Sequence, residues 1–124
     1  MTDVLNVISS EMEKLNINYQ FERYKGTVKY PYFVGSADAD EFISENGYQS
    51  YTVSVNGFSR GSVIELVKAS EKIKNHFADF RTITKGGNGI SITFAALNFI
   101  PQENAELKRI QITLNVQEWS VNNE

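Results

Sequence analysis

His76 is the only histidine in the chain, and its imidazole is the group best suited to acid–base or metal chemistry near neutral pH. It lies within one helical turn of Lys72, Asp79 and Phe80, and Arg81 follows closely. A dispersed site built from Asp79, Arg81 and His76 would make the chain a weak enzyme. Catalysis or metal binding needs partners that the spacing does not reveal, so we favour a solvated or rim histidine.

The acidic group Asp38, Asp40, Glu41 and Glu45 supplies carboxylate oxygens, which are the ligands of hard cations. Its spacing lacks the glycine and the terminal bidentate glutamate of an EF-hand loop. We therefore expect Ser36 to Gly47 to be a solvated loop between strands and predict no metal site.

The glycine-rich stretch Lys85 to Gly89 resembles a phosphate cradle only superficially. No Gly-Lys-Ser/Thr follows, and a strand rather than a helix comes next, so a hairpin turn is favoured. The serines show no nucleophile-elbow pattern. The chain has no cysteine, which excludes disulfides, thiolate metal sites and a cysteine nucleophile. We expect no catalytic, cofactor-binding or metal-binding residues and no enzyme activity.

Length and charge set broad limits. A chain of 124 residues has the size of one domain with a single core. Lysine and arginine number 12 against 15 acidic residues, and the net charge of −3 gives no global attraction to nucleic acid or to an anionic membrane. No apolar run reaches the length of a membrane span and no signal peptide is apparent, so a soluble protein without a membrane partner is expected.

A strand, a turn and a helix at the centre of the chain organise the prediction. Tyr51 to Val55 alternates apolar and polar residues with the period of a half-buried strand. Gly57 and Gly61 predict a tight reversal after that strand. Ser62 and Glu65 have the spacing of a capping box, which places the start of the helix directly after Ser62.

Periodicity predicts the remaining elements. The first helix is expected from Asp3 to Leu15 after a Thr2 cap, and the second helix ends at Phe77. Alternating or extended segments are expected at Ile17–Phe21, Tyr32–Ala37, Arg81–Thr84, Ile90–Phe94 and Arg109–Gln117.

This order predicts an α+β fold, with two helices packed on one antiparallel or mixed sheet of about four to five strands. The expected order is α-β-β-β-α-β-β. Residues 1–119 would form a single α+β domain and residues 120–124 a loose C-terminal tail.

Two residues are candidates for an interface. Ile64 falls on the polar side of the second helix, and Trp119 continues the polar register of the last strand. Exposed apolar and aromatic side chains of this kind are enriched at interfaces. The alternative is that Ile64 packs against Phe58 under the preceding turn and that Trp119 folds over a sheet edge.

Three segments resemble small proteins encoded among the tail genes of long-tailed bacteriophages and prophages. They are YQFERYKGTVKYPYFVG at Tyr19 to Gly35, GFSRGSVIELVKASEKIKNHF at Gly57 to Phe77, and AELKRIQITLNVQEW at Ala105 to Trp119. With the element order, the pattern is similar to tail-terminator and tail-completion (tail-to-head joining) proteins. The resemblance spans about residues 1 to 119 and carries no catalytic signature.

The resemblance implies a non-enzymatic structural protein of the virion tail, made in the bacterial host cytoplasm. Such a subunit forms a hexameric ring with itself on the tail tube, and its further partners are the tail-tube protein and the head-completion or connector protein. DNA passes through the ring without specific binding. Ring contacts are expected from Tyr24–Tyr32 and from Ser36–Gly47, which carries Asp38, Asp40, Glu41 and Glu45.

The competing hypothesis is a free-standing small α+β module that binds a ligand or a protein without a phage assembly role. A deep apolar pocket with converging polar groups would favour it. A flat surface would favour assembly.

Overall fold

A computed structural model describes residues 2–22, 26–27, 29–39, 47–104 and 106–119. Two helices and six strands follow one another along the chain. They are α1 (Thr2–Lys14), β1 (Tyr19–Phe21), β2 (Tyr32–Ala39), β3 (Tyr48–Arg60), α2 (Ile64–Phe77), β4 (Phe80–Ile83), β5 (Gly89–Ile100) and β6 (Leu107–Trp119). All six strands belong to one sheet in the order β1-β2-β3-β6-β5-β4.

The sheet is mixed: β1 pairs with β2 in parallel, and every other neighbouring pair is antiparallel. The fold is broadly α+β, but the prediction of four to five strands in the order α-β-β-β-α-β-β was wrong. The order is α-β-β-β-α-β-β-β. The additional strand is β4, which overlaps the segment Arg81–Thr84 that was expected to be extended but was not counted as a strand. It has four residues, too few to show alternation, and it pairs with Gly89–Ile92 of β5.

The predicted reversal at Gly57 was also wrong, because Gly57 lies inside β3. A Cβ atom there would clash with Cε1 of Phe33, which sits directly opposite in β2. The glycine therefore allows close packing of an aromatic ring. The chain turns at Gly61, whose φ of 88° is the left-handed conformation that glycine adopts readily.

Helix α2 begins one residue later than predicted. Its N-cap is Val63, and no side-chain hydrogen bond caps it, so the predicted capping box was wrong. The Ser62 hydroxyl still accepts a hydrogen bond from the Ile64 amide at 3.2 Å. Its carbonyl accepts one from the Ser59 hydroxyl at 2.9 Å, so the hydroxyls stabilise the turn before the helix.

Four strands, β2, β3, β5 and β6, are longer than predicted. Strand β2 continues past Ala37 to Ala39 in register with β3, so Ser36–Ala39, the first third of the predicted acidic loop, is strand. Residues 40–46, with Asp40, Glu41 and Glu45, lie outside the described residues, as does the predicted tail 120–124. Strand β5 continues to Ile100 after an irregularity between Phe94 and Ala96, which hides the alternation.

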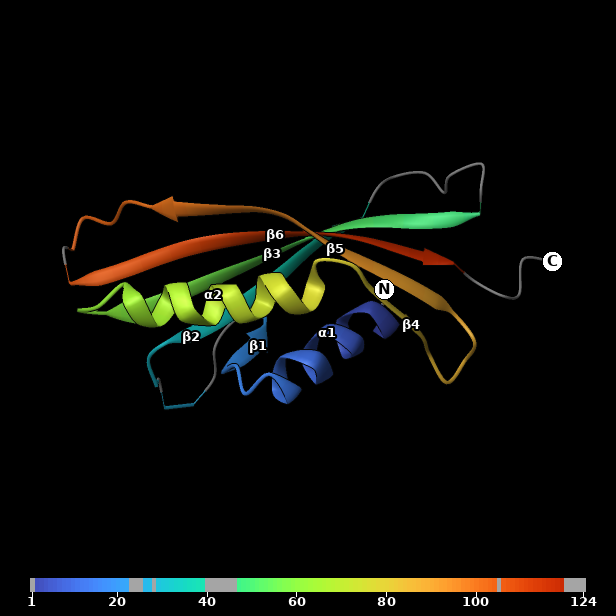
Figure 1. The fold of residues 1–124 in the computed structure, drawn as a ribbon, viewed down its shortest axis with the longest axis horizontal. Helices are drawn as coiled ribbons and strands as arrows, with labels where there is room; N and C mark the ends of the chain where they lie inside the picture. The colour runs from blue at the N-terminus through green and yellow to red at the C-terminus, as the bar shows by residue number, and fades with distance from the viewer. Residues whose placement is uncertain (1, 23–25, 28, 40–46, 105, 120–124) are drawn as a thin grey trace.

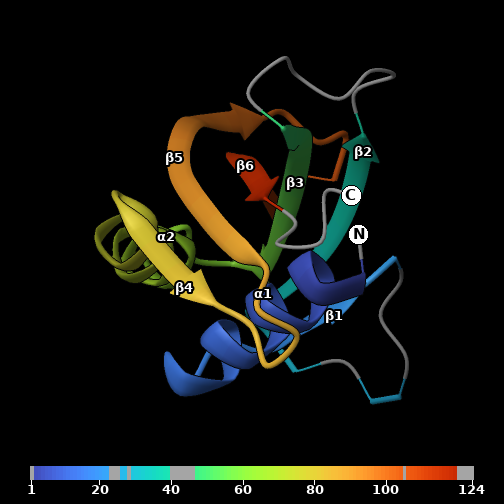
Figure 2. The same cartoon turned by 90° about the vertical axis from the view of Figure 1, so that its right-hand side faces the viewer.

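Both helices pack against one face of a strongly twisted sheet (Figure 1), and β5 is visibly bent when the molecule is turned (Figure 2). The shared core takes Val4, Ile8 and Met12 from α1, Leu66, Ala69, Ile73 and Phe77 from α2, and apolar side chains from four strands: Phe33, Tyr51, Val53, Val55, Ile90, Ile92, Ile110, Ile112, Leu114 and Val116. Among the described residues, no helix covers the opposite face of the sheet.

Candidate interaction surface

The uncovered face of the sheet, here called the open face, consists mainly of uncharged polar side chains. Residues paired across strands share a face, and their sequence neighbours point to the other one. Because Val53 and Leu114 are buried, the residues beside them form the open face. Its uncharged polar members are Ser36, Ser50, Thr52, Ser54, Asn56, Ser91, Thr93, Asn98, Gln111, Thr113, Asn115 and Gln117.

An aromatic and cationic cluster closes one end of the open face. The rings of Tyr32 and Phe58 stack with centroids 5.0 Å apart. The Arg109 guanidinium carbon lies 5.8 Å from the Phe58 ring centroid, and its Nη2 and Nε donate to Oδ1 of Asn56 at 2.9 and 3.3 Å. Arg109 is therefore fixed on the sheet by its neighbours.

Trp119 marks the other end of the open face. Its ring centroid lies 5.3 Å from that of Tyr48, and it pairs with Gly89 on the other side. Strand β6 is central in the sheet, so the alternative that Trp119 folds over a sheet edge was wrong. Trp119 is 36% exposed, and Ile83, which pairs with Gly89, is 76% exposed. An open hollow of about 420 Å³ is lined by Trp119 and Gly89.

Ile64 lies at the opposite end of the molecule, where β3 leads into α2. It is 60% exposed, and Phe99 of β5 is 59% exposed. The alternative that Ile64 packs against Phe58 was wrong, because Phe58 points to the open face and stacks on Tyr32. Val63 and Phe99 line one hollow, and Ile64 follows Val63 in the chain. We call these three side chains the Phe99 patch.

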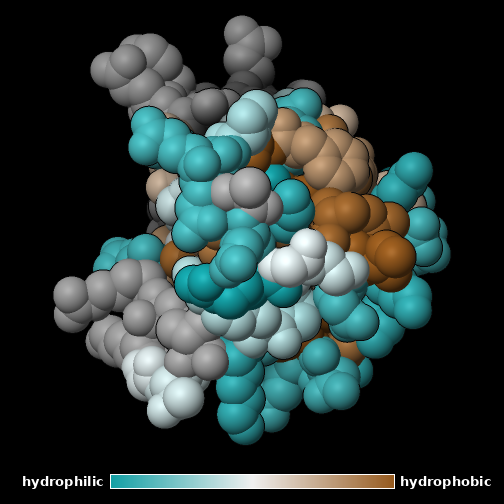
Figure 3. All heavy atoms as spheres, turned by 90° about the vertical axis from the view of Figure 1, so that its left-hand side faces the viewer, coloured by the Kyte–Doolittle hydropathy of each residue, from teal (hydrophilic) through white to brown (hydrophobic). Residues whose placement is uncertain are grey.

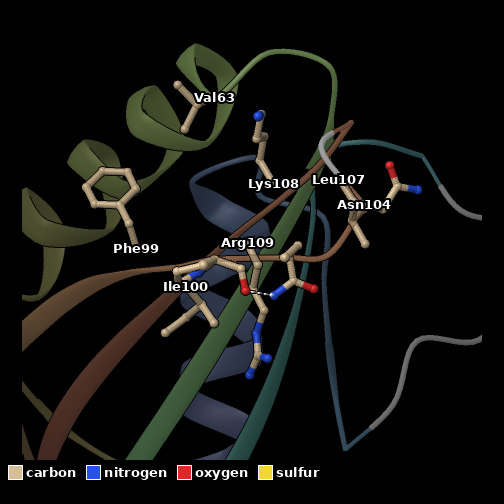
Figure 4. Close-up of a pocket in the computed structure, with 9 residues that line it drawn as sticks. Val63, Phe99, Ile100, Asn104, Leu107, Lys108 and Arg109 are labelled. Atoms are coloured by element: carbon tan, nitrogen blue, oxygen red, sulfur yellow. Dashed lines mark hydrogen bonds between the residues drawn. The ribbon is translucent and has the colours of Figure 1, made fainter.

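Apolar atoms gather at this end of the molecule when it is viewed from the α2 start (Figure 3). An open hollow of about 320 Å³ lies there, and the close-up shows Val63 and Phe99 near the helix start with Leu107 and Lys108 across from them (Figure 4). The hollow is bordered by the β5–β6 connection and not enclosed by it. It offers a surface contact more than a ligand pocket.

The two exposed apolar regions are separated by the length of the sheet. Tyr48, which contacts Trp119, opens β3, and Arg60 closes it just before the Phe99 patch. Thirteen residues of strand span on the order of 40 Å at about 3.3 Å per residue. The chain therefore presents two different apolar surfaces at opposite ends.

The predicted rim histidine has a specific partner. Nε2 of His76 lies 2.8 Å from Oε1 of Glu11 in α1, and the imidazole packs against Phe77 and Phe80. Glu11 also accepts a hydrogen bond from Lys14 at 2.8 Å. Burial alone would raise the pKa of Glu11, but the hydrogen bonds from Lys14 and His76 outweigh it and leave the pKa lowered.

The sequence analysis missed Glu11, although a signal for it was present. Glu11 follows Ile8 by three residues and precedes Leu15 by four, so it lies on the apolar stripe of the first helix. A carboxylate on such a stripe needs a partner, and the only histidine of the chain provides one.

The residues named for a weak enzyme do not converge. Asp79 and Arg81 form an ion pair at 3.4 Å with both side chains mostly exposed. His76 bonds to Glu11 instead. Asp38 is exposed on the open face near the end of β2. Within the described ranges, no three His, Asp or Glu side chains group closely enough to hold a metal ion.

Comparisons with models of known protein families and with curated protein sequences find no match. Among the described residues, no helix is both long and apolar enough to cross a membrane.

Proposed function

We propose that this chain is a structural protein of a phage or prophage tail that assembles with itself into a ring. The ring caps the tail tube, joins the tail to the head connector, or does both. Its partners would be the tail-tube protein and the head-completion or connector protein, with DNA passing through the ring. The proposed location is therefore the virion tail, after synthesis in the bacterial host cytoplasm.

The open face is the observation that carries this proposal. A channel wall beside moving DNA must not bind phosphate groups, because each phosphate neutralised by lysine or arginine strengthens binding. The middle of the open face is uncharged. Its charged residues lie at the ends and margins: Asp38, Arg60, Arg81 and Arg109. Arg60 pairs with Glu106 at 3.3 Å, and Arg81 pairs with Asp79.

The two separated apolar surfaces also support assembly into the tail. The Phe99 patch lies at one end of the strands and the region around Trp119 and Ile83 at the other, and both expose large apolar side chains. In a ring whose axis runs along the strands, these two ends would face the tail tube and the head connector. Exposed aromatic and aliphatic residues of this kind are typical anchors of protein contacts.

The alternative of a free-standing binding module has less support. It requires an enclosed apolar pocket with converging polar groups. The hollows at Phe99 and Trp119 each have several polar side chains in their lining, but both are open and not enclosed.

Electron microscopy of lysates from a phage or prophage lacking this gene tests the proposal, beside a complemented control. Overlong or headless tail tubes would identify a terminator. Normal-length tails lying unattached beside full heads would identify a joining protein. Ordinary infectious virions would contradict both roles and return the binding module as the better hypothesis.

A further inference from the structure

Among the described residues, no strand pairs with the outer side of β5 along most of its length, and we call this stretch its free edge. Strand β4 pairs only with Gly89–Ile92, whereas β5 continues from Thr93 to Ile100 beside β6. Within the described part of the chain, no backbone hydrogen bond outside the helices and strand ladders involves Thr93–Ile100. In Figure 1 this part of β5 forms the upper border of the sheet.

This free edge has only one of the usual protections against pairing with another chain. Natural edge strands carry lysine, proline or inward-pointing charges, or twist away at a bulge. No charged residue occurs from Gly86 to Gln102, and no proline interrupts Thr93–Ile100. The irregularity at Ala95 is the one protective feature, and Thr93, Asn98 and Phe99 are exposed. The edge is therefore suited to receive a strand.

The opposite margin of the same sheet has a second free edge. Strand β1 pairs only with Phe33–Gly35, so Ser36–Ala39 of β2 have no strand on their outer side among the described residues. The two free edges overlap over a short stretch, in which Ser36–Asp38 of β2 are level with Thr93–Ala96 of β5. Asp38 pairs with Thr52, which pairs with Asn115, which pairs with Thr93.

The strand directions make these two edges compatible. At this level the sheet is β2-β3-β6-β5, and each neighbouring pair is antiparallel, so β2 and β5 run in opposite directions. Rotation about an axis along the strands preserves their directions. Around such an axis, β5 of one copy would meet β2 of the next in antiparallel orientation, which is the more stable pairing.

We propose that the free edge of β5 in one copy pairs with the free edge of β2 in the next copy. This contact would join neighbouring sheets through backbone hydrogen bonds, as in strand addition to a sheet edge. The inference rests on the proposed ring and names the surfaces that close it. One edge is uncharged and the other carries Asp38, so no like-charge repulsion opposes the pairing.

Engineered cysteines test the contact cleanly because the chain has none of its own. The variant Asp38→Cys/Thr93→Cys places one thiol on each edge, and Asp38→Cys/Asn98→Cys samples a second register. Within one chain the two edges are three strand spacings apart, roughly 14 Å at about 4.8 Å each. A disulfide requires Cα atoms within about 7 Å, so only bonds between copies can form.

Both variants are oxidised as purified protein and analysed by non-reducing electrophoresis, with circular dichroism as the check of folding. We expect a ladder of linked copies that stops at the ring size. Asp38→Cys/Glu71→Cys is the matched control, because Glu71 is equally exposed but lies on α2. The control and each single-cysteine variant should give no ladder.

Three results would overturn the inference: no linked copies, an equal ladder from the Glu71 control, or linked dimers from Thr93→Cys alone, which would mean that β5 pairs with itself. A ring seen by sedimentation without an edge-dependent ladder would refute this contact and leave the proposed function intact. An edge-dependent ladder together with ordinary virions from the gene deletion would support this contact and refute the proposed function.

Discussion

Nε2 of His76 lies 2.8 Å from Oε1 of Glu11 and joins α1 to α2 across 65 positions of the sequence. The contact lies beside the core, because Phe77 next to His76 and Met12 next to Glu11 are both fully buried. Since the two helices meet here over the same face of the sheet, the ionisation of Glu11 is coupled to folding.

We expect stability to fall in acid because of Glu11. Its pKa is lowered in the folded state from an ordinary value of 4.5, so its contribution is fully present above that pH and is lost as the pH falls through the lower folded value. Urea unfolding across a pH series measures this loss. Glu11→Gln should flatten the acid side of the profile, whereas Glu13→Gln, an exposed neighbour, should not. Parallel acid profiles for wild type and Glu11→Gln would contradict the prediction.

We expect stability to fall in alkali because of two tyrosines. Burial raises the pKa of Tyr19 to about 12, and burial together with the hydrogen bond to Glu118 raises the pKa of Tyr51 to about 12. Because the folded-state pKa of each tyrosine is raised, the neutral side chain stabilises the folded protein at pH values below the ordinary pKa of 10.0. This contribution is lost as the pH rises towards 12. Tyr51→Phe should reduce this decline in unfolding free energy, with Tyr48→Phe as the control. An unchanged alkaline decline in Tyr51→Phe would argue against it.

Gly57→Ala should destabilise the fold through a steric clash. The added methyl group would clash with Cε1 of Phe33, and that ring is 1% exposed, so it has no free space to move into. Overpacking of this kind costs about 1–3 kcal/mol of unfolding free energy. Gly86→Ala is the control, because its nearest neighbour would be 3.9 Å away. Chemical denaturation measures both, and equal effects would refute the close-packing account of Gly57.

The Phe99 patch should matter for assembly and little for folding. Ile64→Asn and Phe99→Ser alter side chains that are 60% and 59% exposed, so unfolding free energies should change by only about 0.5 kcal/mol. Complementation of the gene deletion by these variants should drop, whereas Lys74→Gln, exposed on α2, should complement normally. Full complementation by both patch variants would mean that the Phe99 patch is not needed for assembly.

The sequence predicted the centre of this fold well. Alternation in Arg109–Gln117 identified β6, and its apolar residues Ile110, Ile112, Leu114 and Val116 are all buried. Both helices were found from their apolar stripes. The margins of the sheet were predicted less well, because β4 has too few residues to show a period and the irregularity in β5 interrupts its alternation.

Glycine caused the wrong prediction of a chain reversal at Gly57. Gly57 and Gly61 carry the same local signal, but one lies under an aromatic ring and the other turns the chain. Only the position of Phe33, distant in sequence, separates the two uses. Of the candidate interface residues, the sequence correctly placed Ile64 and Trp119 at the surface, but it could not reveal that they occupy opposite ends of β3.

The glycines beneath aromatic rings also fix the alignment of the sheet margin. Phe33 lies across Gly57, and Tyr19 lies across Gly35, where an added Cβ would meet its hydroxyl oxygen. If β2 slid by two residues along β3, the Phe33 ring would face Val55 or Ser59 in place of bare backbone. A slide of β2 by one residue would turn every core side chain of β2 to the wrong face of the sheet. Gly35 and Gly57 therefore restrict β2 to one register. A strand whose outer edge pairs with another subunit has to be held in a single register.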